Sequence, residues 1–137
     1  MPTDTPSAIT LDDANSVLTA APFGPWWGFS VRSVAYGEAV VVLVARPEHF
    51  RPGGVLQGGC CMTLADVAFW LATMTITGMD TPAVTLEMKT NFLRAASGDL
   101  QCSSKVILAG RRVMYGDART CAADGKIVAH HTLTYLR

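Results

Sequence analysis

One stretch of the sequence combines an open backbone with a single carboxylate in an apolar setting. Gly58 and Gly59 precede the longest apolar run of the chain, and Asp66 is the only charged residue between Gly59 and Met79. The first amides of a helix lack partners within the helix and lie at the positive end of its dipole. Glycine at that point leaves room for a ligand carbonyl. The pattern indicates either a donor for the oxyanion of an acyl transfer or only a tight turn before a helix.

Asp66 lies about two helical turns into the same run. An unpaired carboxylate is costly in apolar surroundings, so either catalysis or a hydrogen bond to a strand must account for it. A catalytic carboxylate could attack an acyl carbon or deprotonate water. At the rise of an α-helix, Gly58 and Asp66 are about 12 Å apart, too far to meet one carbonyl carbon within one chain. If they cooperate, Asp66 acts with Gly58 of another subunit, which predicts a homodimer with active sites at its interface.

Cysteine and histidine offer a competing chemistry. Cys60 and Cys61 lie at the predicted helix start, where thiolates are favoured, and could pair with His49, His130 or His131. Neighbours on a strand point to opposite faces, so His130 and His131 make a poor joint metal site. The four cysteines include no C-x-x-C pair and are expected to be reduced thiols of a cytosolic protein. The sequence contains neither a G-x-S-x-G elbow nor a phosphate-binding glycine loop.

The composition fits one folded domain. The chain has 137 residues, half of them hydrophobic, and a formal net charge of zero, which argues against nucleic acid or an anionic membrane surface as the main partner. Residues 1–9 are predicted to form a flexible tail and residues 10–137 a single domain. The apolar run contains Asp66 and several threonines, which favours a buried helix over a membrane span. The first residues do not form a secretory signal, so a cytoplasmic location is expected.

Apolar periodicity predicts a short N-terminal helix, a long central helix and a mostly antiparallel sheet. Thr10 and Asp13 form a capping box before the first helix. Strict alternation along 83–93 places Thr85 on the face opposite Met88 and Thr90. Because a nearly all-apolar helix must be enclosed, we expect a curved sheet to wrap around it, and unpaired edges to favour assembly. The predicted helices are 11–21 and 59–77; the predicted strands are 29–34, 38–46, 83–93, 100–109, 112–122 and 127–136.

Several motifs occur in an order that matches a known family. They are Gly-Gly-Val-Leu-Gln-Gly-Gly at 53–59, Leu-Ala-Asp at 64–66, Val-Thr-Leu-Glu-Met-Lys-Thr-Asn-Phe-Leu-Arg at 84–94, Gly-Arg-Arg at 110–112 and Asp-Gly-Lys at 124–126. Over roughly residues 24–137 the chain resembles the hotdog-fold acyl-CoA thioesterases of the PaaI-like branch. The resemblance implies an α+β hotdog fold, in which a curved antiparallel sheet wraps one long central helix. It also implies a homodimer, which in turn pairs into a homotetramer.

The resemblance also implies roles by position. The Gly58 amide would polarise the thioester carbonyl, Asp66 would be nucleophile or general base, and Thr85 would hold the attacking water. Gln57 replaces the usual histidine; it can hydrogen-bond the thioester or orient a water but cannot act as an acid. Arg51 and Gly110 to Arg112 would contact coenzyme A, with only one of Arg111 and Arg112 facing it if both lie on a strand. The remaining substrate contacts expected are Gly59 and, as walls of the acyl pocket, Met62, Phe69, Trp70 and the pair Trp26 and Trp27.

The expected activity is hydrolysis of an acyl-CoA or aryl-CoA thioester to a free acid and coenzyme A. No metal and no cofactor are expected, because coenzyme A enters as part of the substrate. Two other functions stay open: a non-catalytic acyl-CoA binding or sensing protein, and a hydratase or dehydratase on the same fold. The hydratase sites of this fold usually pair a carboxylate with a histidine, and Gln57 takes the place of that histidine here.

Overall fold

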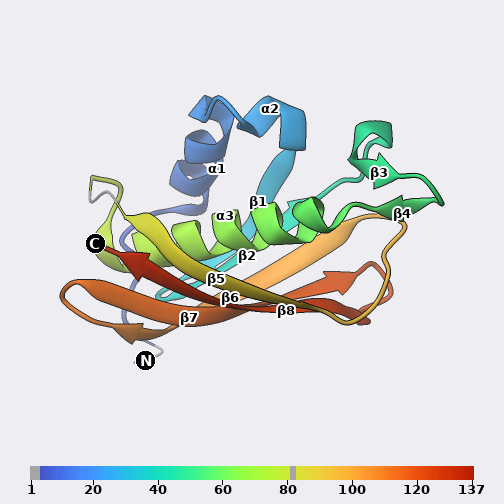
Figure 1. Cartoon of the computed structure of the whole chain (residues 1–137). Coiled ribbons are helices and arrows are strands. Elements are labelled where there is room, and N and C mark those ends of the chain that lie inside the picture. The colour runs from blue at the N-terminus through green and yellow to red at the C-terminus, as the bar shows by residue number, and fades with distance from the viewer. Residues whose placement is uncertain (1–3, 81–82) are drawn as a thin grey trace.

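A six-stranded antiparallel sheet curves around one long helix (Figure 1). The computed structural model describes residues 4–80 and 83–137. The strands lie in the order β1-β2-β6-β7-β8-β5, and a separate two-stranded hairpin is formed by β3 and β4. The helices are α1 (Leu11–Ala20), α2 (Gly24–Trp27), the short helix η1 (Pro47–His49) and α3 (Gly58–Thr77); the strands are β1 (Phe29–Ala35), β2 (Glu38–Leu43), β3 (Phe50–Arg51), β4 (Val55–Leu56), β5 (Val84–Phe92), β6 (Leu100–Ala109), β7 (Val113–Ala122) and β8 (Ile127–Leu136).

The central helix α3 is the core of the protein. It is long and apolar enough to cross a membrane by length and composition alone, yet most of it is buried inside the fold. An α-helix that is apolar on nearly all sides must be enclosed, and the sheet provides that enclosure. One stripe stays open: Gly58 and Met62 are exposed, and Asp66 and Trp70 are half-buried. These residues are spaced four apart and therefore share one face of the helix.

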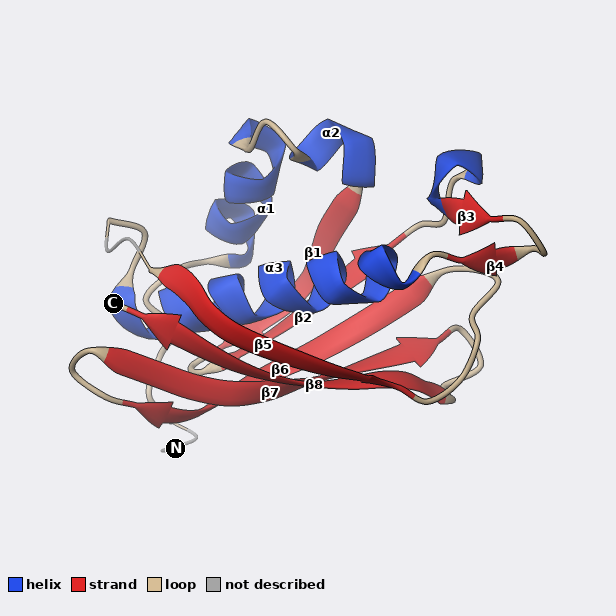
Figure 2. Ribbon diagram, in the orientation of Figure 1, coloured by secondary structure: helices blue, strands red, loops and turns tan. Residues whose placement is uncertain are grey.

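A small helical layer covers the side of α3 that faces away from the sheet (Figure 2). The predicted capping box of α1 is confirmed, since Thr10 Oγ1 accepts from the Asp13 amide and the Asp13 carboxylate accepts from the Thr10 amide. The predicted N-terminal tail is shorter than expected. Ile9 is buried, and the Ala8 amide donates to the Thr75 carbonyl of α3. Residues 1–3 of that predicted tail lie outside the described residues.

The long elements match the prediction, and the short ones were missed. The central helix ends at the predicted Gly78, whose φ is 83°. The strand predicted over 38–46 ends at Leu43, and the following segment forms η1, β3 and β4 in place of a plain loop. Two-residue strands and a single helical turn leave no periodic apolar pattern, so alternation cannot detect them.

A β-bulge in β5 corrects the predicted alternation. The pairing between β5 and β8 shifts register between Thr85 and Glu87. Thr85 therefore lies on the side of α3, where its hydroxyl reaches Asp66, and Thr90 on the same side reaches the buried His131. A bulge adds one residue to a strand and so reverses the faces beyond it. Strict alternation had placed these two threonines on opposite faces.

Candidate active site

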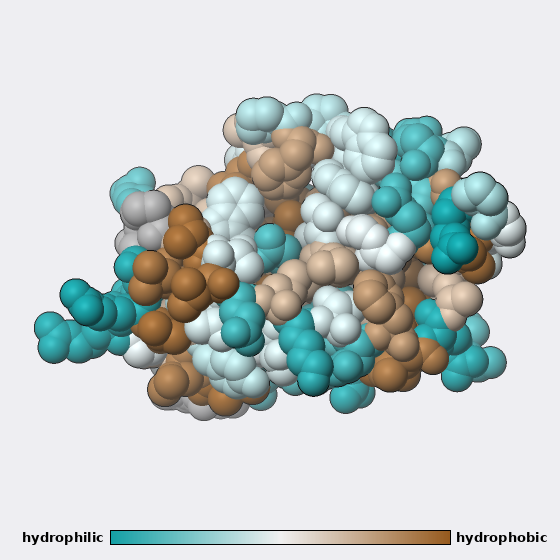
Figure 3. Space-filling model, viewed as in Figure 1, coloured by the Kyte–Doolittle hydropathy of each residue, from teal (hydrophilic) through white to brown (hydrophobic). Residues whose placement is uncertain are grey.

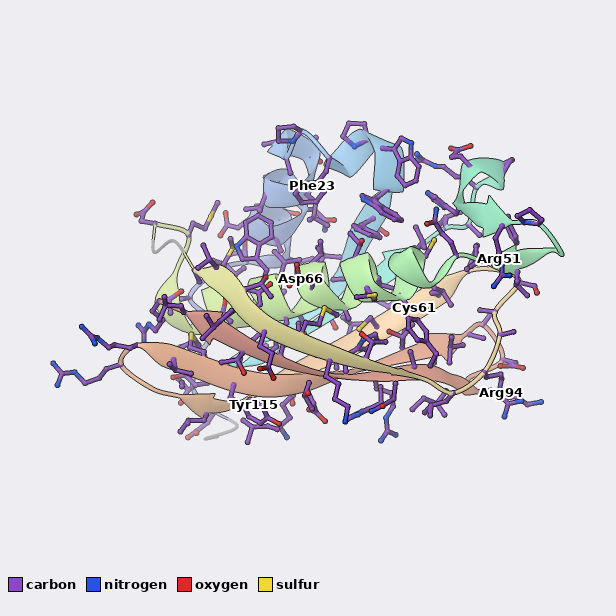
Figure 4. All side chains as sticks on the ribbon, viewed as in Figure 1. Phe23, Arg51, Cys61, Asp66, Arg94 and Tyr115 are labelled. Carbon is purple, nitrogen blue, oxygen red and sulfur yellow. The ribbon has the colours of Figure 1, made fainter. Side chains whose placement is uncertain are left out.

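Asp66 lines an open cavity of about 310 Å³ between α3, the N-terminal layer and the end of the sheet. Figure 4 shows Phe23 directly above Asp66 in that view. The walls are mostly apolar, and Trp70 follows Asp66 one helical turn later along the open stripe. The lining residues are Phe23, Asp66, Val67, Trp70, Ala83, Val84, Thr85 and Tyr135. The cavity is therefore an apolar space with one carboxylate in its wall.

Two hydroxyl groups hold the Asp66 carboxylate by the same oxygen. Thr85 Oγ1 donates to Oδ1 at 2.8 Å, and the Tyr135 hydroxyl lies 2.6 Å from Oδ1 and 2.8 Å from the Asp66 backbone carbonyl. No hydrogen bond within residues 4–80 and 83–137 reaches Oδ2. The arrangement fixes the side chain and leaves Oδ2 as the oxygen available to a molecule in the cavity.

The Tyr135 side chain is buried and packs against Phe69. Its ring is 2% exposed and meets the Phe69 ring edge to face at 5.0 Å. Burial and the neighbouring Asp66 charge raise the pKa of Tyr135 above its ordinary value, so its hydroxyl stays protonated and can donate. Phe69, expected as a wall of the acyl pocket, is fully buried in the core beneath Tyr135 and lines neither of the two cavities at α3.

A second cavity, of about 490 Å³, lies at the start of α3. Gly58 lines it together with Arg51, Cys61 and Arg94, and the two arginines come from β3 and from the segment after β5 (Figure 4). Within the described part of the chain no hydrogen bond uses the Gly58 amide. The Phe92 ring lies against Gly58, 3.0 Å from the position that a β-carbon would occupy there. The helix start thus offers a free donor beside two cations.

Gln57 and Gly59 flank this donor. Gln57 is the N-cap residue of α3, but its side chain makes no capping hydrogen bond. Its Oε1 lies 3.3 Å from the position of a β-carbon on Gly59, so the amide group folds over the first turn of the helix. Gln57 is exposed there, which leaves its amide group accessible to a molecule at the helix start.

The two candidate groups lie in separate cavities within one chain. Asp66 lines the first cavity and Gly58 the second, and Met62 lies between them on the open stripe. This separation agrees with the two helical turns counted in the sequence. One chain alone therefore does not bring Gly58 and Asp66 to one carbonyl carbon.

Gly110, Arg111 and Arg112 form the turn between β6 and β7. The Arg112 carbonyl accepts from the Arg137 amide, and the Gly110 carbonyl accepts from the Arg137 side chain. Both arginines of the turn are exposed, and β7 begins only at Val113. The strand alternation that was expected to turn one of them away from a ligand therefore does not apply. In the register of the sheet, this turn lies at the Asp66 end, because Val113 and Val84 both pair with Leu136.

The geometry does not assemble a Cys–His nucleophile. Burial raises the pKa of Cys61 to about 11 and that of Cys60 above its ordinary value, which disfavours the thiolate. Cys60 Sγ donates to the backbone carbonyl of His49, not to its ring. His131 is fully buried, with Thr90 on one ring nitrogen and Thr120 on the other.

Trp26 and Trp27 belong to a different cluster from the one expected. Both pack around the buried His49, with ring centroids 5.2 and 5.5 Å from its ring, and Trp27 stacks on Phe29. The aromatic residue that lines the Asp66 cavity from this layer is instead Phe23, the N-cap residue of α2. Its position depends on the turn between α1 and α2, which the sequence does not reveal.

Sequence reasoning also missed Tyr135 and Arg94. Tyr135 lies on the inward face of β8, and the alternation of buried residues along that strand identifies it as inward, although not as a partner of Asp66. Arg94 is the arginine of the Phe-Leu-Arg motif, and it lines the same cavity as Gly58, which only the three-dimensional arrangement reveals.

Comparisons with known proteins identify the family and the fold. A family model for the thioesterase superfamily matches residues 53–129. SSO2140 of Saccharolobus solfataricus, classed provisionally as an esterase, is 38% identical over 95 residues, which span 68% of this chain and just under two thirds (66%) of that relative. A single-site variant of the phenylacetic acid degradation protein PaaI from Thermus thermophilus is 32% identical, with a TM-score of 0.77 over 85% of this chain and 99% of its own.

A vertebrate structure has the same fold. Zebra fish thioesterase superfamily member 2 is 26% identical, with a TM-score of 0.83 over 93% of this chain and 98% of its own. The family match covers more than half of the chain and includes both the helix start and Asp66. The predicted hotdog fold, PaaI-like resemblance and enzyme class are confirmed. The chain belongs to the thioesterase superfamily of hotdog-fold thioester hydrolases.

Proposed function

We propose that this thioester hydrolase acts on acyl-CoA or aryl-CoA, releases a free acid and coenzyme A, and uses Asp66 as its nucleophile or general base. The observation that carries the proposal is the Asp66 carboxylate, held by Thr85 and Tyr135 through Oδ1 and left open at Oδ2 in the wall of an apolar cavity. Oδ2 would attack the thioester carbonyl or take a proton from water. The apolar cavity would receive the acyl group.

The Gly58 amide supplies the second part of the proposed chemistry. A free N–H at a helix start is aimed outward and lies at the positive end of the helix dipole. The thioester oxygen gains negative charge during attack, and the amide would stabilise that charge. Gln57, with its side chain free at the same helix start, would hydrogen-bond the thioester or orient the water.

Two subunits would complete each site. Edge strand β5 pairs with β8 on one side only among the described strands, and its Val84 and Leu86 are 60% and 61% exposed. Figure 3 shows apolar side chains gathered over the part of the surface where β5 begins. Unpaired apolar edges favour association, and a two-fold dimer uses the same surface on both copies. Asp66 would then face Gly58 of the partner subunit, with Met62 near the axis, and two such dimers would pair into a homotetramer.

The same arrangement would gather cations for coenzyme A. Arg51 and Arg94 lie beside Gly58. Arg111 and Arg112 lie at the end of the sheet that is near Asp66. An interface that joins Asp66 to the helix start of the other subunit would bring both pairs near one coenzyme. Arginine suits phosphate because its planar fork donates two hydrogen bonds. These contacts would hold the nucleotide while the acyl group enters the apolar cavity.

A cytoplasmic location is part of the proposal. All four cysteines are free thiols, and three of them are buried. Free thiols suit the reducing cytosol, where acyl-CoA is made and used.

The test is thiol release from short, medium, long and aryl acyl-CoAs, measured side by side for the wild type and for Asp66→Ala. Loss of the nucleophile or base should lower kcat on the order of 10²-fold or more. Asp66→Asn, which keeps the size of the side chain, is the matched variant, and sedimentation checks assembly. Equal rates in wild type and both variants would remove Asp66 from the mechanism. Tight binding without turnover in the wild type would instead indicate an acyl-CoA binding protein.

A further inference from the structure

Tyr135 stands apart from the residues already assigned, because it lies on the last strand and is almost fully buried. Its hydroxyl is 2.6 Å from Asp66 Oδ1 and 2.8 Å from the Asp66 backbone carbonyl. No other side chain among the described residues hydrogen-bonds both the carboxylate and the main chain of Asp66. Such a pair of hydrogen bonds restrains the side-chain torsions of Asp66.

Given the function proposed above, we propose that Tyr135 is a positioning residue, which holds Asp66 Oδ1 so that Oδ2 alone faces the substrate. Thr85 donates to the same oxygen from the other side, across the bulge of β5. A carboxylate with both donors on one oxygen cannot rotate without breaking both hydrogen bonds. Tyr135 thus fixes the orientation of the carboxylate, so that its other oxygen faces the thioester or the water.

The support beneath Tyr135 makes this orientation rigid. Its ring meets Phe69 edge to face, and Phe69 in turn lies against Gly116 of β7, where a β-carbon would overlap the Phe69 ring and the Lys105 backbone. Aromatic side chains packed in this way have few alternative rotamers. Gly116 and Phe69 therefore restrict the position of the Tyr135 ring, and with it the position of the hydroxyl that binds the carboxylate.

The chemistry of Tyr135 suits this role. Burial, followed by the nearby Asp66 charge, raises its pKa, so the hydroxyl remains a donor at the pH values where a thioesterase works. A hydrogen bond donated to a carboxylate favours its charged form, which is the form that attacks or accepts a proton. Tyr135 touches neither the thioester nor the water in this scheme and acts only through Asp66.

The experiment compares Tyr135→Phe with the wild type, with Asp66→Ala and with the double variant. Removal of the hydroxyl should lower kcat about 10- to 100-fold with little change in KM, because the lost contact is to the catalytic group and not to the substrate. In the Asp66→Ala background the second substitution should have no further effect on the residual rate.

Tyr115→Phe is the matched control. Tyr115 lies on β7, next to the residue that pairs with Tyr135, and it faces the outside of the sheet (Figure 4). It loses the same hydroxyl and should keep wild-type kinetics. A purely structural Tyr135 would lower the melting temperature and leave both kcat and KM unchanged in Tyr135→Phe, which would overturn the inference. Full activity in Asp66→Ala would instead overturn the proposed function, so the two failures are distinguishable.

Discussion

Gly58 and Asp66 contribute different kinds of group, and each can be removed without disturbing the other. Asp66 offers a side-chain oxygen, whereas Gly58 offers only its backbone amide. Alanine does not remove an amide, so the usual substitution leaves the proposed role of Gly58 untested. Proline removes it, because its ring nitrogen carries no hydrogen.

We predict that Gly58→Pro strongly lowers kcat without unfolding the protein. Gly58 is the first residue of α3, where proline is well tolerated. Gln57 before it has φ −65° and ψ 147°, which suits a residue that precedes proline. Loss of one oxyanion donor should lower kcat about 10²- to 10³-fold. Steady-state kinetics on the best acyl-CoA, with circular dichroism to check the fold, measure the effect.

Gly58→Ala is the control for bulk at the same position. It keeps the amide and adds a β-carbon about 3.0 Å from the Phe92 ring, which is 55% exposed and free to shift outward. We expect kcat within a few-fold of the wild type. An equal loss in both variants would show that space beside Phe92, and not the amide, matters at the helix start.

At the scale of the elements, strand β8 joins the site to the core of the sheet. Tyr135 and His131 lie on the same inward face of this strand, four residues apart. His131 is fully buried, and its ring nitrogens meet Thr90 of β5 and Thr120 of β7. The His131 ring of β8 is therefore linked by hydrogen bonds to both neighbouring strands, β5 and β7.

We predict that His131 makes stability fall in mild acid. Burial, and then the charge of His130, lowers the pKa of His131 to about 4 from an ordinary value of 6.5. The unfolded chain therefore takes up the proton first, so the free energy of unfolding decreases as the pH falls from about 6.5 towards 4. Between pH 7 and pH 5 the loss should be about 2 kcal/mol, measured by urea unfolding.

His131→Gln should remove the part of the pH dependence of unfolding that comes from His131. Glutamine can still hydrogen-bond both threonines but does not titrate. The difference in stability between wild type and variant should narrow towards pH 5. His130→Gln on the neighbouring, half-exposed position is the matched control and should retain most of the slope. Parallel pH curves for wild type and His131→Gln would contradict the prediction.

The elements also show what a sequence can predict. The long helix and the long strands were predicted within a few residues, because 3.6- and 2-residue periods persist over many positions. The side of β5 on which Thr85 lies was not, because one bulged residue reverses the faces and leaves no mark in composition. The glycines and Asp66 could be selected from the sequence as chemical candidates. Phe23 and Tyr135 line the Asp66 cavity, and Arg94 lines the Gly58 cavity, only because the tertiary fold brings them there.

At the scale of the whole molecule, the central question is whether one site draws on two chains. The candidate groups lie in separate cavities, and the open stripe of α3 lies beside the exposed strand β5 (Figure 1). A shared site makes a prediction that a site within one chain cannot imitate. Two inactive variants, each defective in a different half, should restore activity to one another when their subunits mix.

We predict that Asp66→Ala and Gly58→Pro complement each other. In a mixed dimer one site carries both defects, whereas the other combines an intact Asp66 with an intact Gly58 of the partner subunit. Random mixing in equal amounts should therefore return about a quarter of the wild-type activity. Refolding the two variants together, then measuring thiol release, tests this; refolding each alone is the control. No recovery, with mixed dimers verified by mass spectrometry, would contradict a shared site.

The open stripe of α3 has a consequence for how much enzyme a cell must make. If neither chain holds a complete site, a lone subunit is inert, however well it is folded. Below the dissociation constant of the dimer, the rate would then rise with the square of the protein concentration instead of in proportion to it. A cell that halves its expression of this protein in that range would lose about three quarters of the turnover. The level of expression would thus control the activity more than proportionally, without any separate regulatory site.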